Sequence, residues 1–147
     1  MGSSKDQIVP NRASAKALEI ALGFSFKNPS LLHQALVHLS YCNENNLDPS
    51  ASYERLEFLG DAVLELAVST ELYFRFPDAD EGELTKTRSS LVRRETLAKI
   101  ARRIDLGSYL FVGKGVETSN GREQDSVLSA AFEALIAAVY IDQGNEF

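Results

Sequence analysis

Residues 54–61 of this chain read ERLEFLGD and place three carboxylates within an otherwise apolar run of helical spacing. On a helix, Glu57 and Asp61 are four residues apart and project from one face about a turn apart. An apolar stripe on the same helix would be buried, and it comprises Leu56, Leu59, Val63, Leu66, Ala67 and Thr70. A carboxylate pair beside a buried stripe suggests a hard cation, since magnesium and calcium prefer oxygen ligands. The alternative interpretation is a solvated acidic edge.

Helical patterns continue through the rest of the chain, so the sequence predicts an all-α domain. No run alternates with a period of two, and there is no internal repeat. Residues 42–52 are polar and turn-rich, which favours a loop, and the glycines within 108–122 favour an irregular loop. Helices are expected at 14–22, 29–37, 53–75, 83–103 and 124–143.

Composition is that of an ordinary globular protein of one domain, with 147 residues and a net charge of −6. The single cysteine, Cys42, forms no internal disulfide, which suits a reducing compartment and predicts a cytoplasmic location. No apolar stretch reaches membrane-spanning length and no leader opens the chain, so no membrane partner is expected. Residues 1–13 are expected to be a disordered N-terminus or an expression remnant.

Several ordered motifs together resemble the ribonuclease III family. Besides ERLEFLGD they include DEGEL at 80–84, RSSLV at 88–92 and FEALI at 132–136. The resemblance runs from about residue 16 to residue 144. It implies the helical fold of the ribonuclease III endonuclease domain over 14–147. The double-stranded-RNA-binding domain that follows in the bacterial family is absent, so we expect a shortened form of a longer protein.

The same resemblance implies an activity. The family consists of hydrolases that cleave double-stranded RNA in RNA processing and depend on magnesium, with manganese as a possible substitute. A homodimer cuts both strands, one per subunit, and leaves a 5′-phosphate, a 3′-hydroxyl and a short 3′ overhang. Duplex RNA would be recognised by its shape and 2′-hydroxyls more than by its sequence.

Four positions form the family's metal-binding and catalytic quartet, and this chain keeps three of the carboxylates. By resemblance these are Glu57, Asp61 and Glu133, whereas Ala130 stands where the family carries an aspartate. Alanine has no ligand atom, so metal affinity should fall, although magnesium can be held by few carboxylates and several waters. Ser129, four residues before Glu133, could hold a metal-bound water.

Three further residues receive roles from the resemblance. Glu54 and Glu81 would position the substrate near the cleavage site, although each could also be a helix cap or an ion-pair partner, for example Glu54 with Arg88. Phe58 would be an apolar knob that inserts into the partner subunit of the homodimer. Ordinary core packing is the alternative interpretation for Phe58.

The substitution at Ala130 leaves three accounts open. The chain could be an engineered inactive variant, a natural enzyme with a modified site, or a family member kept for RNA binding. A weakened or inactivated endonuclease ranks first, and a catalytically inactive RNA-binding or ribosome-associated protein is the alternative. A helical scaffold without any RNA role would require accidental motif matches.

Other sequence features give weaker evidence about function. Basic residues crowd one segment and could contact phosphate or simply form a solvated helical face; they are Arg88, Arg93, Arg94, Lys99, Arg102 and Arg103. His33 and His38 have no nucleophile at useful spacing, so neither is expected to be catalytic. Residues 113–115 read GKG without the surrounding phosphate-loop pattern, which favours a flexible loop facing RNA.

Overall fold

The computed structural model describes residues 12–144, and this part of the chain is built from helices without a named strand. Its one ladder contact is an isolated parallel bridge between Val37 and Phe111. The all-α prediction is therefore confirmed. In chain order the elements are α1 (Arg12–Leu22), α2 (Pro29–Ala35), α3 (Leu39–Glu44), η1 (Pro49–Ala51), α4 (Glu54–Arg75), α5 (Glu81–Val92), α6 (Arg94–Arg103), η2 (Leu106–Tyr109), α7 (Lys114–Thr118), η3 (Gly121–Glu123) and α8 (Asp125–Gln143).

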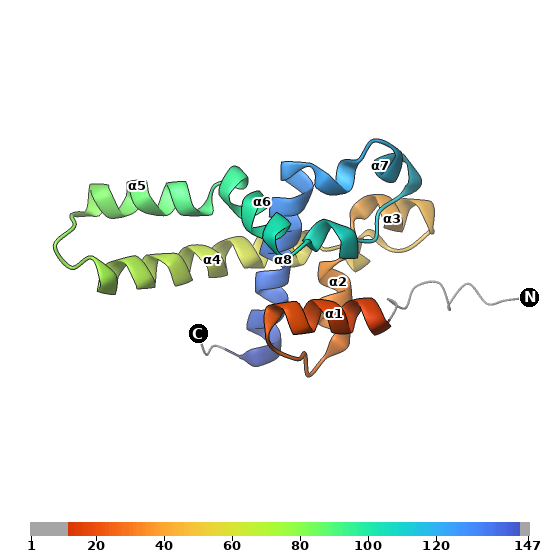
Figure 1. Ribbon diagram of the computed structural model, residues 1–147, viewed down its shortest axis with the longest axis horizontal. Helices are drawn as coiled ribbons and strands as arrows, with labels where there is room; N and C mark the ends of the chain where they lie inside the picture. The colour runs from red at the N-terminus through yellow and green to blue at the C-terminus, as the bar shows by residue number, and fades with distance from the viewer. Residues whose placement is uncertain (1–11, 145–147) are drawn as a thin grey trace, which may run out of the picture.

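Helix α8 is the centre of the core. Its buried side is made of small and medium apolar residues, which allows other helices to approach closely on several sides. Helices α2, α4 and α6 all contact it. Figure 1 shows α8 crossing the middle of the molecule, where α4 and α6 meet it. The largest fully buried apolar side chains of the core include Leu18, Leu32, Leu36, Leu97, Leu106, Leu128 and Leu135. Within residues 12–144, no helix has the length and apolar character needed to cross a membrane.

The contact between α4 and α8 depends on Gly60. A Cβ atom built on Gly60 would lie 1.7 Å from the backbone oxygen of Glu133 and 2.5 Å from its carbonyl carbon. These are main-chain atoms of a buried helix, so they have no flexible side chain that could move away. Only glycine therefore allows the two helices to cross at this distance.

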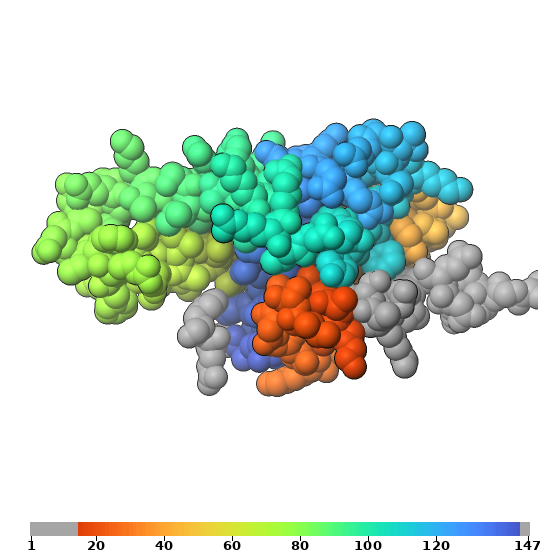
Figure 2. All heavy atoms as spheres, in the orientation of Figure 1, coloured from red at the N-terminus to blue at the C-terminus, as the bar shows by residue number. Residues whose placement is uncertain are grey.

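The second half of α4 leaves the core and pairs with α5 as a projecting hairpin (Figure 1). In the space-filling view the hairpin forms a lobe at one end of the molecule (Figure 2). Helix α4 ends at Arg75, as expected from the nearby Pro77. A reciprocal capping box between Asp80 and Glu83 starts α5. Helix α5 has no buried residue, so it depends on local capping and on its contact with α4 more than on core packing.

One helix was expected over 83–103, and the structure has two. The backbone of Arg93 is extended, with φ −69° and ψ 158°, so α5 ends there and α6 begins at the next residue. Helix α5 follows the projecting hairpin, whereas α6 turns to bury Leu97, Ala98 and Ala101. The break therefore comes from packing against α8, a tertiary effect that local spacing does not reveal.

Two expected loops also contain helices. Residues 42–44 complete α3, which His38 caps and in which Cys42 is fully buried, and η1 occupies part of the remaining loop. The segment 108–122 contains α7 and parts of η2 and η3. At the N-terminus, α1 begins at Arg12, two residues earlier than expected; residues 1–11 lie outside the described range.

Candidate functional site

An open cavity of about 470 Å³ collects carboxylates from the two crossing helices. Its lining consists of Glu54, Glu57, Phe58, Asp61 and Glu133. The first four belong to α4, and Glu133 faces them from α8. The helical spacing of Glu57 and Asp61 turns both toward the cavity, and the close approach at Gly60 carries Glu133 alongside them. The structure thus brings the three expected metal-binding carboxylates to one place.

Like charges dominate the electrostatics of this cavity. Burial, together with the neighbouring charges of Asp61, Glu57 and Glu65, raises the pKa of Glu133 to about 7. Burial also raises the pKa of Glu57, with smaller contributions from Glu54 and Asp61. No lysine or arginine forms an ion pair with these carboxylates within residues 12–144. The cavity therefore lacks a protein cation that would offset its negative charge.

The donor chemistry fits a hard cation that keeps part of its water shell. All charged groups lining the cavity are carboxylates. In the described part of the chain, however, no three His, Cys, Asp or Glu side chains converge tightly enough to enclose a metal ion. Magnesium is commonly held by one or two carboxylates with several waters, so an open site of this kind suits it better than a closed cage would.

Ala130 lies one turn before Glu133 on α8, half-buried and packed against the core. Ser129 does not compensate for the missing carboxylate. Its side chain is buried and its hydroxyl donates a 3.4 Å hydrogen bond to the backbone oxygen of Ser126. The suggested water-holding role of Ser129 therefore has no support in the observed contacts.

The two residues expected to position substrate lie apart from each other. Glu54 lines the acidic cavity. Glu81, at the start of α5, instead borders a hollow on the projecting hairpin together with Tyr73 and Arg88. Arg88 donates a 3.0 Å hydrogen bond to the Ser69 hydroxyl, and it forms no ion pair with Glu54. The suggested pair between Glu54 and Arg88 is therefore wrong.

Phe58 is 82% exposed, so it does not belong to the core of its own chain. It lies between the acidic cavity and a second hollow of about 570 Å³. Most residues that line this hollow are apolar; the lining comprises Leu31, Gln34, Glu54, Arg55, Leu56, Phe58, Leu59 and Ile141. Core packing is thus excluded as the role of Phe58 within one subunit.

Apart from Arg88, the basic residues divide into two groups. Arg93 pairs with Glu95 at 3.8 Å, and Arg102 pairs with Asp125 while also donating to the backbone of residue 123. The remaining cations of α6 point to solvent and have no ion-pair partner in the described residues; they are Arg94, Lys99 and Arg103. The second group leaves a small positive surface on an otherwise acidic chain.

One residue near the site was missed by the sequence reasoning. Glu65 is exposed on α4, four residues after Asp61, and its charge helps to raise the pKa of Glu133. Continuing the spacing of Glu57 and Asp61 by one more turn would have identified it. Glu65 extends the negative field of the cavity without lining it.

Comparison with known proteins identifies relatives of this chain. The Ribonuclease-III-like family matches residues 28–147. Ribonuclease 3 of Dehalococcoides mccartyi is 54% identical over 129 residues, which are 88% of this chain and 54% of that protein. Ribonuclease 3 of Desulforamulus reducens is 54% identical over 132 residues, which are 90% of this chain and 54% of the relative. The chain thus spans about half the length of these curated relatives.

Solved structures of ribonuclease III nuclease domains are also similar to this chain. The nuclease domain of Ribonuclease III from Campylobacter jejuni is 40% identical with a TM-score of 0.81, covering 88% of this chain and 86% of that one. One study of that domain describes structural flexibility in a region involved in dimer formation. Dicer from Pichia stipitis is 32% identical with a TM-score of 0.58, covering 80% of this chain and 47% of that protein.

Proposed function

This chain belongs to the ribonuclease-III-like family, and on that premise we propose that it is the nuclease domain of a metal-dependent endoribonuclease acting on double-stranded RNA. The observation that carries the proposal is the acidic cavity between α4 and α8. Glu57 and Asp61 meet Glu133 there, and no protein cation offsets their charge. Such an arrangement is unfavourable for an isolated domain and becomes favourable when a cation is bound.

The carboxylates of the cavity have two tasks in this proposal. Glu57, Asp61 and Glu133 would hold the divalent cation, magnesium or manganese, partly through its bound waters, and Glu54 would orient the RNA beside it. A cation bound there would stabilise negative charge on the phosphate and lower the pKa of an attacking water. The main-chain contact at Gly60 keeps the two carboxylate-bearing helices at a fixed separation, so the ligands need little reorganisation.

We further propose that the functional unit is a two-fold dimer. Cleavage of both strands needs two sites held across one duplex, and a symmetric pair supplies them. Phe58 is exposed beside a hollow lined by Leu31, Leu56 and Ile141. In a symmetric pair, each Phe58 would enter the hollow of the other subunit. The arrangement would bury apolar surface that a monomer leaves in water.

Duplex RNA is the substrate that fits the remaining surface. The unpaired cations of α6, Arg94, Lys99 and Arg103, can contact phosphates without sequence selectivity. The net charge of −6 limits this contribution. Binding by the chain alone should therefore be weak and should decrease steeply as salt is added. Glu81 keeps its proposed substrate-positioning role, exercised from the hairpin rather than from the acidic cavity.

Ala130 favours a second candidate, a family member that binds duplex RNA without cutting it. The two candidates differ in one measurable quantity, the rate of magnesium-dependent cleavage of a long RNA duplex at low salt. The informative variant is Ala130→Asp. If the chain is an endonuclease limited by the missing ligand, this variant should increase the cleavage rate by about a hundredfold or more, as expected for a group acting directly on the catalytic charge.

Two controls make the comparison specific. Ala130→Asn has nearly the shape of aspartate without its charge, so it should give no increase. Adding Glu133→Gln to Ala130→Asp should abolish the gain, since ligands of one site act as a unit. Circular dichroism would establish that every variant is folded. Duplex binding with no cleavage by the folded Ala130→Asp variant would reject the endonuclease and support the binding protein.

A further inference from the structure

His38 lies where three segments of the chain meet. Its backbone N–H donates a 2.9 Å hydrogen bond to the carbonyl of Phe111, and its ring makes an edge contact with Tyr53 at 5.8 Å between ring centres. Tyr53 immediately precedes α4 and is buried. His38 is also the residue that caps α3. A change in its side chain can therefore affect α3, the 111–113 segment and the start of α4.

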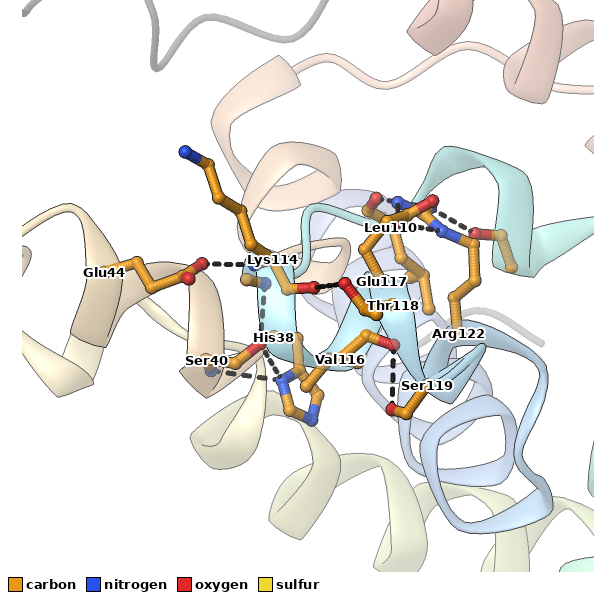
Figure 3. Close-up of polar contacts among 12 residues, drawn as sticks. His38, Ser40, Glu44, Leu110, Lys114, Val116, Glu117, Thr118, Ser119 and Arg122 are labelled. Carbon is orange, nitrogen blue, oxygen red and sulfur yellow. Dashed lines mark hydrogen bonds and ion pairs between the residues drawn. The ribbon is translucent and has the colours of Figure 1, made fainter.

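A short relay of hydrogen bonds runs from His38 to the start of α7 (Figure 3). The Ser40 backbone N–H donates to Nδ1 of His38 at 3.0 Å, and the Ser40 hydroxyl lies 2.7 Å from the same nitrogen. The Gly113 N–H then donates to the Ser40 hydroxyl at 2.8 Å. Beside this relay, the Lys114 N–H donates to the Glu44 carboxylate. The first turn of α7 is thus fastened to α3, which corrects the expectation of a flexible loop at 113–115.

The relay requires a neutral imidazole. Nδ1 accepts the bond from the Ser40 N–H, so it cannot carry a proton, and the ring proton must be on Nε2. The Ser40 hydroxyl can then donate to Nδ1 while it accepts from Gly113. A proton on Nδ1 would oppose the Ser40 N–H and would remove the α3 cap. It would also reverse the direction of the bond to the Ser40 hydroxyl; because that oxygen can accept two bonds, the release of Gly113 would follow from movement of the Ser40 backbone when the cap is lost.

We propose that His38 is a pH-sensitive latch, which holds the start of α7 against α3 when its imidazole is neutral and releases it on protonation. The groups facing the ring determine when this happens. Burial favours the neutral form and lowers the pKa of His38, while the nearby carboxylate of Glu54 on α4 acts in the opposite direction. Tyr53 contributes a buried phenol, and Glu44 and Lys114 flank the relay on α3 and α7.

The sign of the effect follows from these contacts. The folded chain binds the proton less readily than the unfolded chain, whose histidine has its ordinary pKa of 6.5. Stability from the latch is therefore complete above that value and is lost as the pH falls through the lower, folded pKa. The device concerns the α3–α7 contact, so it would operate whether or not the chain cleaves RNA.

Nuclear magnetic resonance of the full chain tests the latch. Protection of the Gly113 amide against hydrogen exchange, corrected for intrinsic rates, should decrease roughly fivefold or more between pH 8 and pH 5, as expected for loss of one hydrogen bond. The midpoint of the Gly113 shift should coincide with the midpoint of the His38 ring itself. A Gly113 amide that stays equally protected through that titration would overturn the proposal.

Three variants separate the latch from other titrations. His38→Asn keeps a capping oxygen but no titrating ring, so Gly113 protection should become independent of pH. Ser40→Ala leaves the histidine and cuts the relay, so Gly113 should be poorly protected at both pH values. His33→Asn is the matched control, because His33 contacts the Phe111 ring near the same segment. Loss of the pH response in His33→Asn, or its persistence in either of the other two, would refute the latch.

Discussion

The two halves of α4 have the same helical geometry and different surroundings. The first half buries Leu56, Gly60 and Val63 against the core, whereas the second half buries Leu72 alone and projects with α5. Exposed aromatic side chains gather on the projecting half, where Tyr73 and Phe74 are 66% and 74% exposed. One continuous helix thus joins a tightly determined site to a region whose apolar surface is left without a partner in the single chain.

The largest expected difference between the two regions is the stability cost of adding one methyl group to each. Gly60→Ala should cost about 3 kcal/mol or more of unfolding free energy, because the new Cβ would overlap the Glu133 backbone. Gly82→Ala in α5 should change stability by less than about 1 kcal/mol, because its Cβ would meet only the capping carboxylate of Asp80 at 3.3 Å, and alanine favours the helix more than glycine does. Thermal or urea unfolding of both variants provides the measurement. Equal losses would mean that the crossing is not the rigid point of the fold.

Phe58 gives the second comparison, between folding and self-association. Phe58→Ala should weaken dimerisation by about thirtyfold, the effect of losing an interface hot spot of roughly 2 kcal/mol. Its effect on the unfolding of the monomer should be small, because the side chain is 82% exposed. Sedimentation velocity over a concentration series would measure the first quantity. A wild-type chain that stays monomeric at micromolar concentrations would contradict the proposed interface.

The smallest expected effect is a pH dependence of the unfolding free energy, which arises in the acidic cavity. Because the folded pKa of Glu133 is raised to about 7, the folded state binds its proton more tightly than the unfolded state does. Without divalent cations, the unfolding free energy should therefore decrease by about 1 kcal/mol, after allowance for solvent screening, as pH rises from the ordinary carboxyl pKa through 7. Glu133→Gln should remove this component, and Glu65→Gln should reduce it.

Cation addition supplies the control for that measurement. Magnesium or manganese at pH 8 should raise the melting temperature of the wild-type chain, because a ligand that binds only the folded state stabilises it. The rise should be smaller in Glu133→Gln. If unfolding curves of the wild type are unaffected by both pH and divalent cations, the acidic cavity is not a cation site.

Sequence reasoning predicted the parts of the molecule whose causes are local. The apolar stripe of α4 and the stop before Pro77 gave that helix nearly to the residue, and the i, i+4 spacing put Glu57 and Asp61 on one side of it. The break at Arg93 was not predictable in this way, because it exists to let Leu97 and Ala98 reach α8. The location of Glu81 on the hairpin likewise depends on how far that hairpin projects.

The distances between helices could not be predicted from local sequence patterns either. Glu133 lies near Asp61 because the backbones of α4 and α8 touch at Gly60, and the periodicity of the sequence does not predict such a contact. The relay from His38 to Gly113 joins residues 75 positions apart, so it emerged only with the fold. The resemblance to a known family supplied what the local patterns lacked, namely which distant carboxylates belong together.

The glycine at position 60 also sets a condition for protein engineering. The width of the acidic cavity follows from a main-chain contact, and the carboxylate side chains can adjust it only by their own rotamers. Adapting the cavity to a larger ion, such as a lanthanide used as a luminescent probe, therefore requires the helices to be moved apart first. A designer would first substitute the residues around Gly60 so that the two helices lie farther apart, and would choose the carboxylates afterwards.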